Sequence, residues 1–227
     1  MYFDMLSEYY DHLLNGAYEA ETTAEERLFK TIIQATDNAI KYASACENGK
    51  ELYVKNLLGK ATLLIRAKPQ KRKAIYRLIK KAEQLISDEF STDDKIRTHY
   101  LMVCAWFYTL SEPNFALVNE LLQKTWENVS ENTADLDDID NRIIPCANIY
   151  CYWEELEIAN KLLLEGIQIC EANESIVPYV RKKMQLYGCY LDVLKIAGDQ
   201  KQIDDLLSKI EDLNKEYEPL DIRLDVS

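Results

Sequence analysis

The chain has 227 residues, of which 48% are apolar, and only six Gly and five Pro. Few helix breakers and ample core material exclude a disordered chain and favour a folded helical one. The net charge of −12 argues against direct nucleic-acid binding, and no apolar run approaches the roughly 20 residues that span a bilayer.

Turn residues and apolar periodicity divide the chain into helical hairpins. Asn15-Gly16 ends the first helix, and Gly198-Asp199 separates the last two. Pro69 and Pro113 split the second and third hairpins, because proline is tolerated in a first helical turn but not in a helix interior. Five hairpins are expected, near residues 2–46, 51–87, 93–129, 137–172 and 176–216.

A pattern of three residues at positions i, i+4 and i+7, which we call the recurrent phrase, is found on the second helix of the second to fifth hairpins. Successive copies start 42, 42 and 44 residues apart. Such a period is typical of stacked helical repeats, in which each hairpin buries its apolar face against its neighbours. We therefore predict an all-α fold, a right-handed α-solenoid of about five tetratricopeptide-like hairpins in one domain over residues 1–227. The copies are Ile75…Ile79…Ala82, Leu117…Leu121…Lys124, Ala159…Leu163…Gly166 and Ile203…Leu207…Ile210.

The residues favour binding over chemistry. The only histidines, His12 and His99, are far apart in sequence, and no Gly-rich phosphate loop or nucleophile motif occurs. The six cysteines show no CxxC spacing and are expected to be reduced, buried thiols. We expect a protein that is not an enzyme, with no catalytic residue, no metal and no cofactor.

The N-terminal stretch from Met1 to Asn15 carries acidic residues and no Lys or Arg. A secretory signal peptide begins with a basic region. We therefore expect a cytoplasmic protein that does not associate with a membrane.

Charge is unevenly distributed. Residues 48–90 sum to +7, whereas residues 1–47 sum to −6 and residues 91–227 to −13. The dense part runs from Lys68 to Lys81, where Lys73, Arg77 and Lys80 share one helix face. Two interpretations stay open: a docking patch for an acidic partner or nucleic acid, and a solvated face that contacts acids on a neighbouring hairpin.

In tetratricopeptide-like superhelices the first helix of each hairpin lines the concave groove. When these first helices are aligned on the tetratricopeptide repeat, Met102, Thr109, Cys151 and Gln185 are expected to face the groove, together with the predicted peptide-binding residues given below. An Asn side chain can donate to and accept from one peptide unit, which suits an extended peptide. Alternatively, Trp106 and Tyr152 belong to the core, and Asn148 caps or bridges buried backbone. The predicted peptide-binding residues are His99, Trp106, Asn141, Asn148, Tyr152, Asp192 and Lys195.

A family resemblance covers roughly the last third of the chain. The runs IIPCANIYCYWEELEIANKLLLEGIQI, from Ile143, and YVRKKMQLYGCYLDVLKIAGDQKQIDDLLSKIEDL, from Tyr179, resemble the C-terminal repeat domain of Rgg-type transcriptional regulators. These regulators are related in architecture to the PlcR and Rap peptide-pheromone receptors. The resemblance implies the ligand-sensing part of a bacterial transcriptional regulator, usually dimeric through its last helices, with Asn148 as a clamp on peptide backbone.

The resembling regulators begin with a helix-turn-helix domain, whereas this sequence begins with MYFDMLSEYYDHLL. Either that domain lies outside this sequence, or the protein is a stand-alone structural scaffold or oligomerisation module. A broad apolar stripe on the last helix, from Ile203 to Leu213, favours a homodimer. The expected partners are a short peptide or protein segment and a second copy of the chain.

Overall fold

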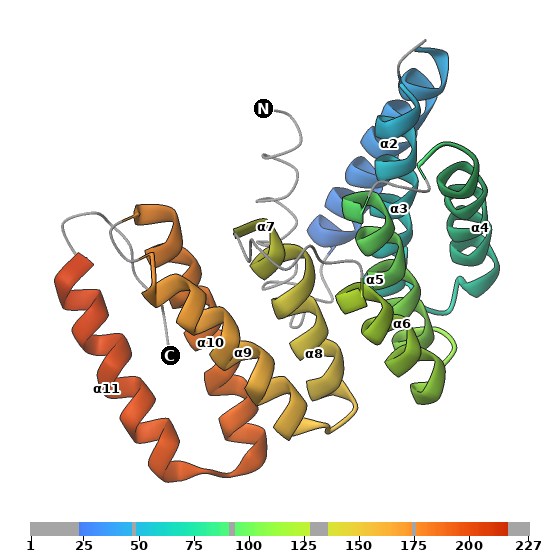
Figure 1. Cartoon of the computed structure of the whole chain (residues 1–227). Coiled ribbons are helices and arrows are strands. Elements are labelled where there is room, and N and C mark those ends of the chain that lie inside the picture. The colour runs from blue at the N-terminus through green and yellow to red at the C-terminus, as the bar shows by residue number, and fades with distance from the viewer. Residues whose placement is uncertain (1–22, 47–48, 91–93, 128–135, 174–175, 218–227) are drawn as a thin grey trace. The chain divides into compact units, whose positions relative to one another are not determined.

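The computed structural model describes residues 23–46, 49–90, 94–127, 136–173 and 176–217, and every regular element in these ranges is helical (Figure 1). The all-α prediction is confirmed for this part of the chain. The expected first helix, Tyr2 to Leu14, lies outside the described residues. Among the described helices, none has the length and apolar character needed to cross a bilayer.

Contacts divide the chain into two compact units, Met1–Lys60 and Ala61–Ser227. The first unit contains α2 (Thr23–Ala45) and most of α3 (Lys50–Ala67). Lys60 on α3 forms an ion pair with Asp37 on α2. The single continuous domain expected from the sequence stays a prediction. The buried apolar side chains described in this unit are Ile32, Ala43, Val54, Leu57 and Leu58.

The second unit continues from the end of α3 into a series of antiparallel helices. Their observed ends lie within two residues of the helix ends expected from the turn signals. The elements are α4 (Arg72–Glu89), α5 (Asp94–Leu110), α6 (Phe115–Glu127), α7 (Leu136–Asp138), the π-helix η1 (Ile139–Ile143), α8 (Ile144–Tyr152), α9 (Leu156–Glu171), α10 (Val177–Ala197) and α11 (Gln200–Tyr217).

Neighbouring helices of the second unit pack on one another. Helix α5 packs on α4 and α6, α9 packs on α8 and α10, and α10 packs on α11. Helix α8 also contacts α5 and α10. In Figure 1 the helices α8 to α11 follow one another in chain order. Helix α8 therefore lies against helices from both neighbouring hairpins, and this position decides which of its side chains stay open.

Proline and glycine explain the local irregularities of this unit. Pro145 lies in the first turn of α8, directly after η1. Because proline has no backbone N–H, it cannot continue the α-helical hydrogen-bond ladder from the preceding turn, and a wider π turn precedes it. Gly198 ends α10 with φ = 72°, a left-handed conformation that costs glycine little. The Asp199 carboxylate then accepts from the backbone N–H of Gln202 and caps α11.

The structure corrects one copy of the recurrent phrase. On α6 the buried positions are Val118, Leu122 and Thr125, each fully buried, whereas Lys124 is exposed. The expected copy beginning at Leu117 was therefore wrong by one residue, since the neighbouring positions are also apolar and fit the same spacing. The corrected copies start 43, 41 and 44 residues apart, at Ile75, Val118, Ala159 and Ile203.

On α9 the third position of the recurrent phrase is Gly166, and the packing of the neighbouring helices leaves no room for a larger residue there. A Cβ atom added to Gly166 would lie 3.0 Å from Leu186 Cδ2 and 3.1 Å from Ile143 Cγ2. Gly166 therefore allows α9 to approach η1 and α10 closely. This contact helps to fix the position of the α8 and α10 surfaces described next.

Candidate functional site

Helix α8 is buried on nearly every side. Cys146, Ala147, Ile149 and Tyr150 are each 5% exposed or less, yet Asn148 between them is exposed. The Asn148 side chain makes no hydrogen bond with another described residue, so the structure gives no support to a capping or bridging role. The amide points out of a helix that is otherwise part of the core.

A second exposed side chain lies on the same face of α8. Tyr152, 56% exposed, lies four residues after Asn148, and residues at this spacing share one face of an α-helix. Asn141 is also exposed and lies in the preceding π-helix η1. Tyr152 is thus a surface residue and not part of the core, which was the alternative left open by the sequence.

Helix α10 carries a second polar stripe. Gln185, Asp192 and Lys195 are exposed, and their spacing of seven then three places them on one face. Buried residues such as Met184, Leu191 and Leu194 occupy the rest of the helix at neighbouring positions. The burial pattern therefore places Gln185, Asp192 and Lys195 on the exposed side of α10, whereas Lys183 is buried.

Two interactions connect α10 with η1 and α8. Lys182 on α10 forms an ion pair with Asp140 in η1, and its ammonium group also donates to Gln185 Oε1 of its own helix at 2.7 Å. Further along, burial raises the pKa of the Cys151 thiol, and the nearby charge of Asp192 raises it further. We call the joint surface of Asn141, Asn148, Tyr152, Gln185, Asp192 and Lys195 the α8–α10 face.

Helix α5 contributes less to this surface than the sequence predicted. Met102 and Thr109 are 4% and 0% exposed, so their expected place in the groove was wrong. Met102 Sδ accepts a hydrogen bond from Cys146 Sγ at 3.7 Å, and Thr109 Oγ1 accepts one from Trp153 Nε1 at 3.2 Å. Both side chains hold α5 against the following hairpin.

The two predicted site residues on α5 are only half-buried. His99 and Trp106 are both of intermediate exposure. The guanidinium carbon of Arg66 lies 5.3 Å from the centroid of the Trp106 ring, so one face of this ring is already covered by a cation. The other five predicted residues, Asn141, Asn148, Tyr152, Asp192 and Lys195, are all exposed and lie on η1, α8 and α10, whereas His99 and Trp106 lie on α5.

The thiols near this face are not activated. Burial raises the pKa of Cys146 to about 12 and that of Cys189 to about 11, and the Asp192 charge contributes to the second shift. These thiols are neutral at physiological pH and therefore poor nucleophiles.

The α8–α10 face offers amide, phenol, carboxylate and ammonium groups, which form hydrogen bonds and ion pairs. In the part of the chain that the structure describes, His, Cys, Asp and Glu form no group of three that could hold a metal ion.

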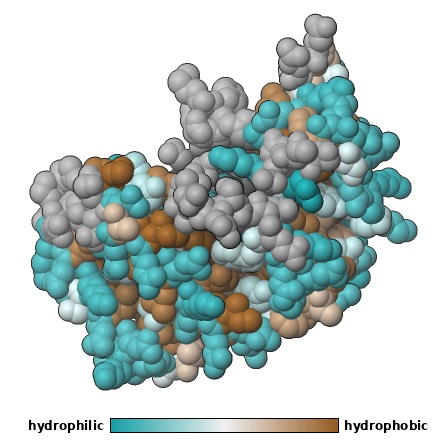
Figure 2. Space-filling view, in the orientation of Figure 1, coloured by the Kyte–Doolittle hydropathy of each residue, from teal (hydrophilic) through white to brown (hydrophobic). Residues whose placement is uncertain are grey.

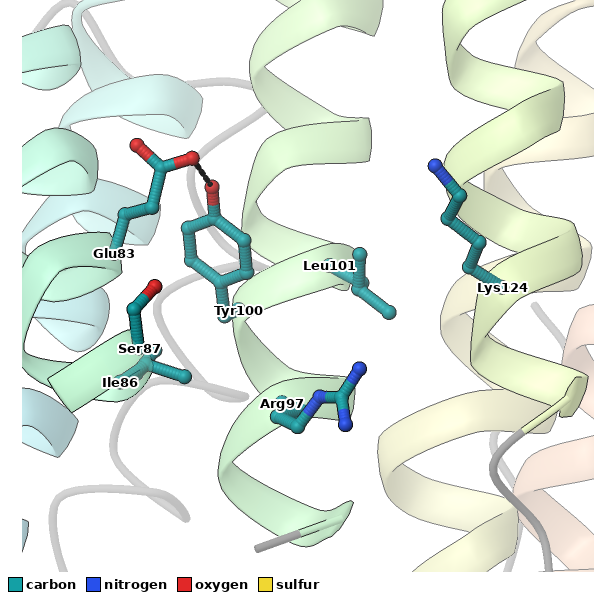
Figure 3. A pocket seen from close by; sticks show the side chains of 7 residues that line it. All are labelled: Glu83, Ile86, Ser87, Arg97, Tyr100, Leu101 and Lys124. Carbon is teal, nitrogen blue, oxygen red and sulfur yellow. Dashed lines mark hydrogen bonds between the residues drawn. The ribbon is translucent and has the colours of Figure 1, made fainter. Parts of the chain in front are cut away.

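A pocket of about 340 Å³, which the sequence did not suggest, opens between α4, α5 and α6. Figure 3 shows the Tyr100 hydroxyl donating to a Glu83 carboxylate oxygen, with 2.9 Å between the two oxygens. Arg97 on α5 and Lys124 on α6 each extend toward the facing helix. Hydrogen bonds from Lys80 and Tyr100 hold the pKa of Glu83 below its ordinary value. None of the predicted site residues lines this pocket. Its lining is Glu83, Ile86, Ser87, Arg97, Tyr100, Leu101 and Lys124.

Sequence reasoning also missed a buried cation. Arg142 in η1 is 4% exposed, and its guanidinium carbon lies 4.3 Å from the centroid of the Trp126 ring. Its Nη2 lies 3.3 Å from Asp138 Oδ1, whereas Nε and Nη1 have no hydrogen-bond partner among the described residues. The only sequence signal is an Arg among isoleucines, with Ile139 and Ile143 nearby.

Comparison with family models, with curated proteins and with solved structures found no match to this chain.

Proposed function

We propose that the chain is a peptide- or protein-binding repeat module and that the α8–α10 face is its binding surface. One observation carries the proposal: Asn148 is exposed although the two residues on either side of it, Cys146, Ala147, Ile149 and Tyr150, are each buried. A core helix that keeps a polar amide open, beside a second polar stripe, has the character of a groove wall.

We further propose that the helices of the second unit stack as tetratricopeptide-like repeats in a right-handed α-solenoid. The support comes from contacts between equivalent positions of successive hairpins. Met102 contacts Cys146 and Thr109 contacts Trp153, in both cases 44 residues apart. Contacts of this separation match the period of the recurrent phrase, as expected when one hairpin repeats the position of the last.

The same relation holds between the next two hairpins. Asp140 pairs with Lys182, 42 residues later, and Asp192 acts on Cys151, 41 residues earlier. The earlier residue of one segment contacts the earlier residue of the other, and the later contacts the later, as expected for parallel helices. The separations of 42 and 41 residues also match the period of the recurrent phrase. This arrangement supports a continuous groove lined by first helices.

The chemistry of the α8–α10 face suits an extended peptide. The Asn148 amide can donate to a peptide carbonyl and accept from the N–H of the same chain, which gives affinity independent of the peptide's sequence. Asp192 and Lys195 supply opposite charges for polar side chains or chain ends, and the Tyr152 ring supplies apolar contact. A bound protein segment would use the same groups.

The resemblance to the peptide-sensing domain of Rgg-type regulators supports the same class of ligand, and we propose a role as the ligand-sensing part of such a regulator. The homodimer through the last helix remains part of this proposal. Ile203, Leu206 and Ile210 on α11 are buried within one chain, however, so the apolar stripe that favoured the dimer is already covered. A stand-alone scaffold without a small ligand is the competing possibility.

The test selects ligands from a displayed library of random short peptides with the full-length chain as bait. For a selected peptide, Asn148→Ala should weaken binding by about 1 to 3 kcal/mol, because the substitution leaves peptide backbone groups unpaired. Isothermal titration calorimetry measures the affinity. The matched control is Gln168→Ala, which removes an equally exposed amide from α9 and should leave the affinity unchanged.

Two results would contradict the proposal. Selection might yield no peptide above the background of an unrelated helical protein, which would favour a scaffold. Alternatively, Asn148→Ala and Gln168→Ala might weaken binding equally, which would place the peptide elsewhere on the surface. Melting curves of both variants accompany the titrations, so that loss of binding is not confused with loss of fold.

A further inference from the structure

Helix α4 carries a cationic ridge on its exposed side. Eight Lys or Arg and no Asp or Glu occur between Arg66 and Lys81. On α4 the buried stripe is Ile75, Ile79, Ala82 and Ile86. Figure 2 shows hydrophilic residues at the right-hand edge of the molecule, where α4 lies in Figure 1. We define the cationic ridge as the exposed residues Arg72, Lys73, Arg77, Lys80 and Lys81.

The cations at the start of this ridge lie at the N-terminus of α4, where a helix favours acidic residues. The first turn of α4 has no acidic residue, and its N-cap residue, Lys71, makes no side-chain capping hydrogen bond. A lysine has no acceptor for a cap, and cations near a helix N-terminus oppose the macrodipole, at a cost of about 0.3 to 1 kcal/mol each. Lys71, Arg72 and Lys73 therefore destabilise the helix that they begin.

The structure also removes the simplest explanation for these cations, which is pairing with acids on a neighbouring hairpin. Arg72, Lys73 and Arg77 make no ion pair or hydrogen bond through their side chains with any described residue. Lys80 pairs with Glu83 of its own helix at 2.5 Å. Cations that destabilise their own helix, and that form no ion pair with a described residue to offset this, are expected where a surface serves binding.

The size of the ridge limits what can bind there. From Lys73 to Lys81 the helix rises about 12 Å, which matches about four residues of extended chain. Tyr76, 43% exposed, adds an aromatic surface beside Lys80, whose Nζ lies 5.7 Å from the ring centroid. The ridge can thus take a short segment that carries several negative charges.

The rest of the chain argues against a long polyanion. Residues 91–227 contain 26 Asp or Glu and 13 Lys or Arg. At physiological salt, charges are screened over about 8 Å. A nucleic-acid strand that continued beyond the ridge would therefore soon meet an acidic surface, whereas a short acidic peptide segment would end before it.

We propose that the cationic ridge of α4 is a docking surface for a short segment, rich in Asp and Glu, of a partner protein. The ridge shares no residue with the α8–α10 face, so this proposal does not depend on the proposed peptide-binding function. The complementary charge supplies orientation and association rate, and Tyr76 supplies apolar contact.

The test uses the full-length chain and a fluorescein-labelled octapeptide of glutamate, with binding measured by fluorescence anisotropy at low and physiological salt. The triple variant Arg72→Glu, Lys73→Glu and Arg77→Glu should lose at least about tenfold in affinity, since three exposed charge pairs are reversed. The matched control, Lys161→Glu, Lys201→Glu and Lys209→Glu, makes the same change in net charge on exposed residues of α9 and α11. It should change the affinity less than about twofold.

A second readout separates a binding surface from an ordinary solvated face. Because the α4 substitutions place acids in the first turn, they should raise the melting temperature by about 1 to 3 °C while binding falls. A lower melting temperature would contradict the unfavourable placement on which the proposal rests.

Two binding results would overturn the proposal. An equal loss of affinity in the control variant would show that only net charge matters. A labelled twelve-nucleotide thymidine strand that binds more tightly than the glutamate peptide, and that loses binding in the α4 variant, would instead assign the ridge to single-stranded nucleic acid.

Discussion

Helix α4 buries a single stripe, Ile75, Ile79, Ala82 and Ile86, and exposes most of its other side chains. Helix α8, in the same unit, is covered on most sides and exposes mainly Asn148 and Tyr152. On α4 exposure is the rule, so an exposed charge carries little information by itself. On α8 exposure is the exception, so one open amide is already informative.

An exposed polar or charged side chain therefore suggests a binding role on α8 by itself, whereas on α4 it does so only together with further evidence. Among the α4 cations, Arg72 and Lys73 became informative through their cost to the first turn and because their side chains pair with no described residue. Asn148 became informative through the burial of Ala147 and Ile149 on either side of it. Perturbing α8 at one buried and one exposed position tests whether this distinction holds.

The largest expected effect is on α8. Ile149→Ala should lower the free energy of unfolding by about 2 to 5 kcal/mol, because a fully buried side chain is removed and a cavity is left. Asn148→Ala, one residue earlier, should change it by less than about 0.5 kcal/mol. Urea unfolding followed by circular dichroism measures both values. A large loss from Asn148→Ala would place Asn148 in a structural network and would break the contrast between exposed and buried positions on this helix.

The second expected effect concerns pH. Burial raises the pKa of Cys146 from its ordinary value of 9.0 to about 12. The neutral thiol therefore stabilises the fold fully below about pH 9, and this contribution is lost as pH rises toward the folded pKa, by about 1.4 kcal/mol for each pH unit.

Urea unfolding at intervals from pH 8 to pH 10.5 checks this expectation. The parent chain should lose stability faster above pH 9 than a Cys146→Ala variant, because the variant lacks this thiol. The comparison of slopes is independent of any constant cost of the substitution. Parallel slopes would mean that Cys146 is not as deeply desolvated as its 0% exposure indicates.

The smallest effect is expected at Arg142, the buried counterpart of the α4 cations. Arg142→Met should lower the free energy of unfolding by less than about 1 kcal/mol, because losing the contacts with Trp126 and Asp138 is offset by removing two buried nitrogens without partners. Chemical denaturation measures it, with Arg142→Lys as the variant that keeps the charge. A loss of about 3 kcal/mol or more from Arg142→Met would show that these nitrogens are paired in solution.

Much of the helical layout could be predicted because its signals are local. Pro113 and Gly198 separate helices through their own backbone preferences, and the ends of the helices followed within two residues. The register of α6 was less certain, since Leu117, Val118, Leu121 and Leu122 allow two apolar stripes. Only packing against neighbouring helices selected Val118 and Leu122 as the fully buried ones.

For the candidate site, helical spacing predicted the face and tertiary packing decided its extent. Asn141, Asn148 and Tyr152 were expected to be open from helical register alone, and all three are exposed, although the π-helix η1 interrupts the α-helical spacing between Asn141 and Asn148. Met102 and Thr109 fit the same rule on α5, yet the next hairpin covers them through Cys146 and Trp153.

The sequence by itself determined that this chain forms helices, where they break, and that residues 48–90 are basic while residues 91–227 are acidic. These properties follow from backbone preferences, apolar period and residue charge, which act over a few neighbouring residues. Only the tertiary structure decided which polar side chains stay open, that Arg142 is buried, and that Arg72 and Lys73 at the start of α4 pair with no side chain in the described part of the chain. Burial and pairing depend on helices about 40 residues apart in sequence, and one helix's pattern does not say what covers it.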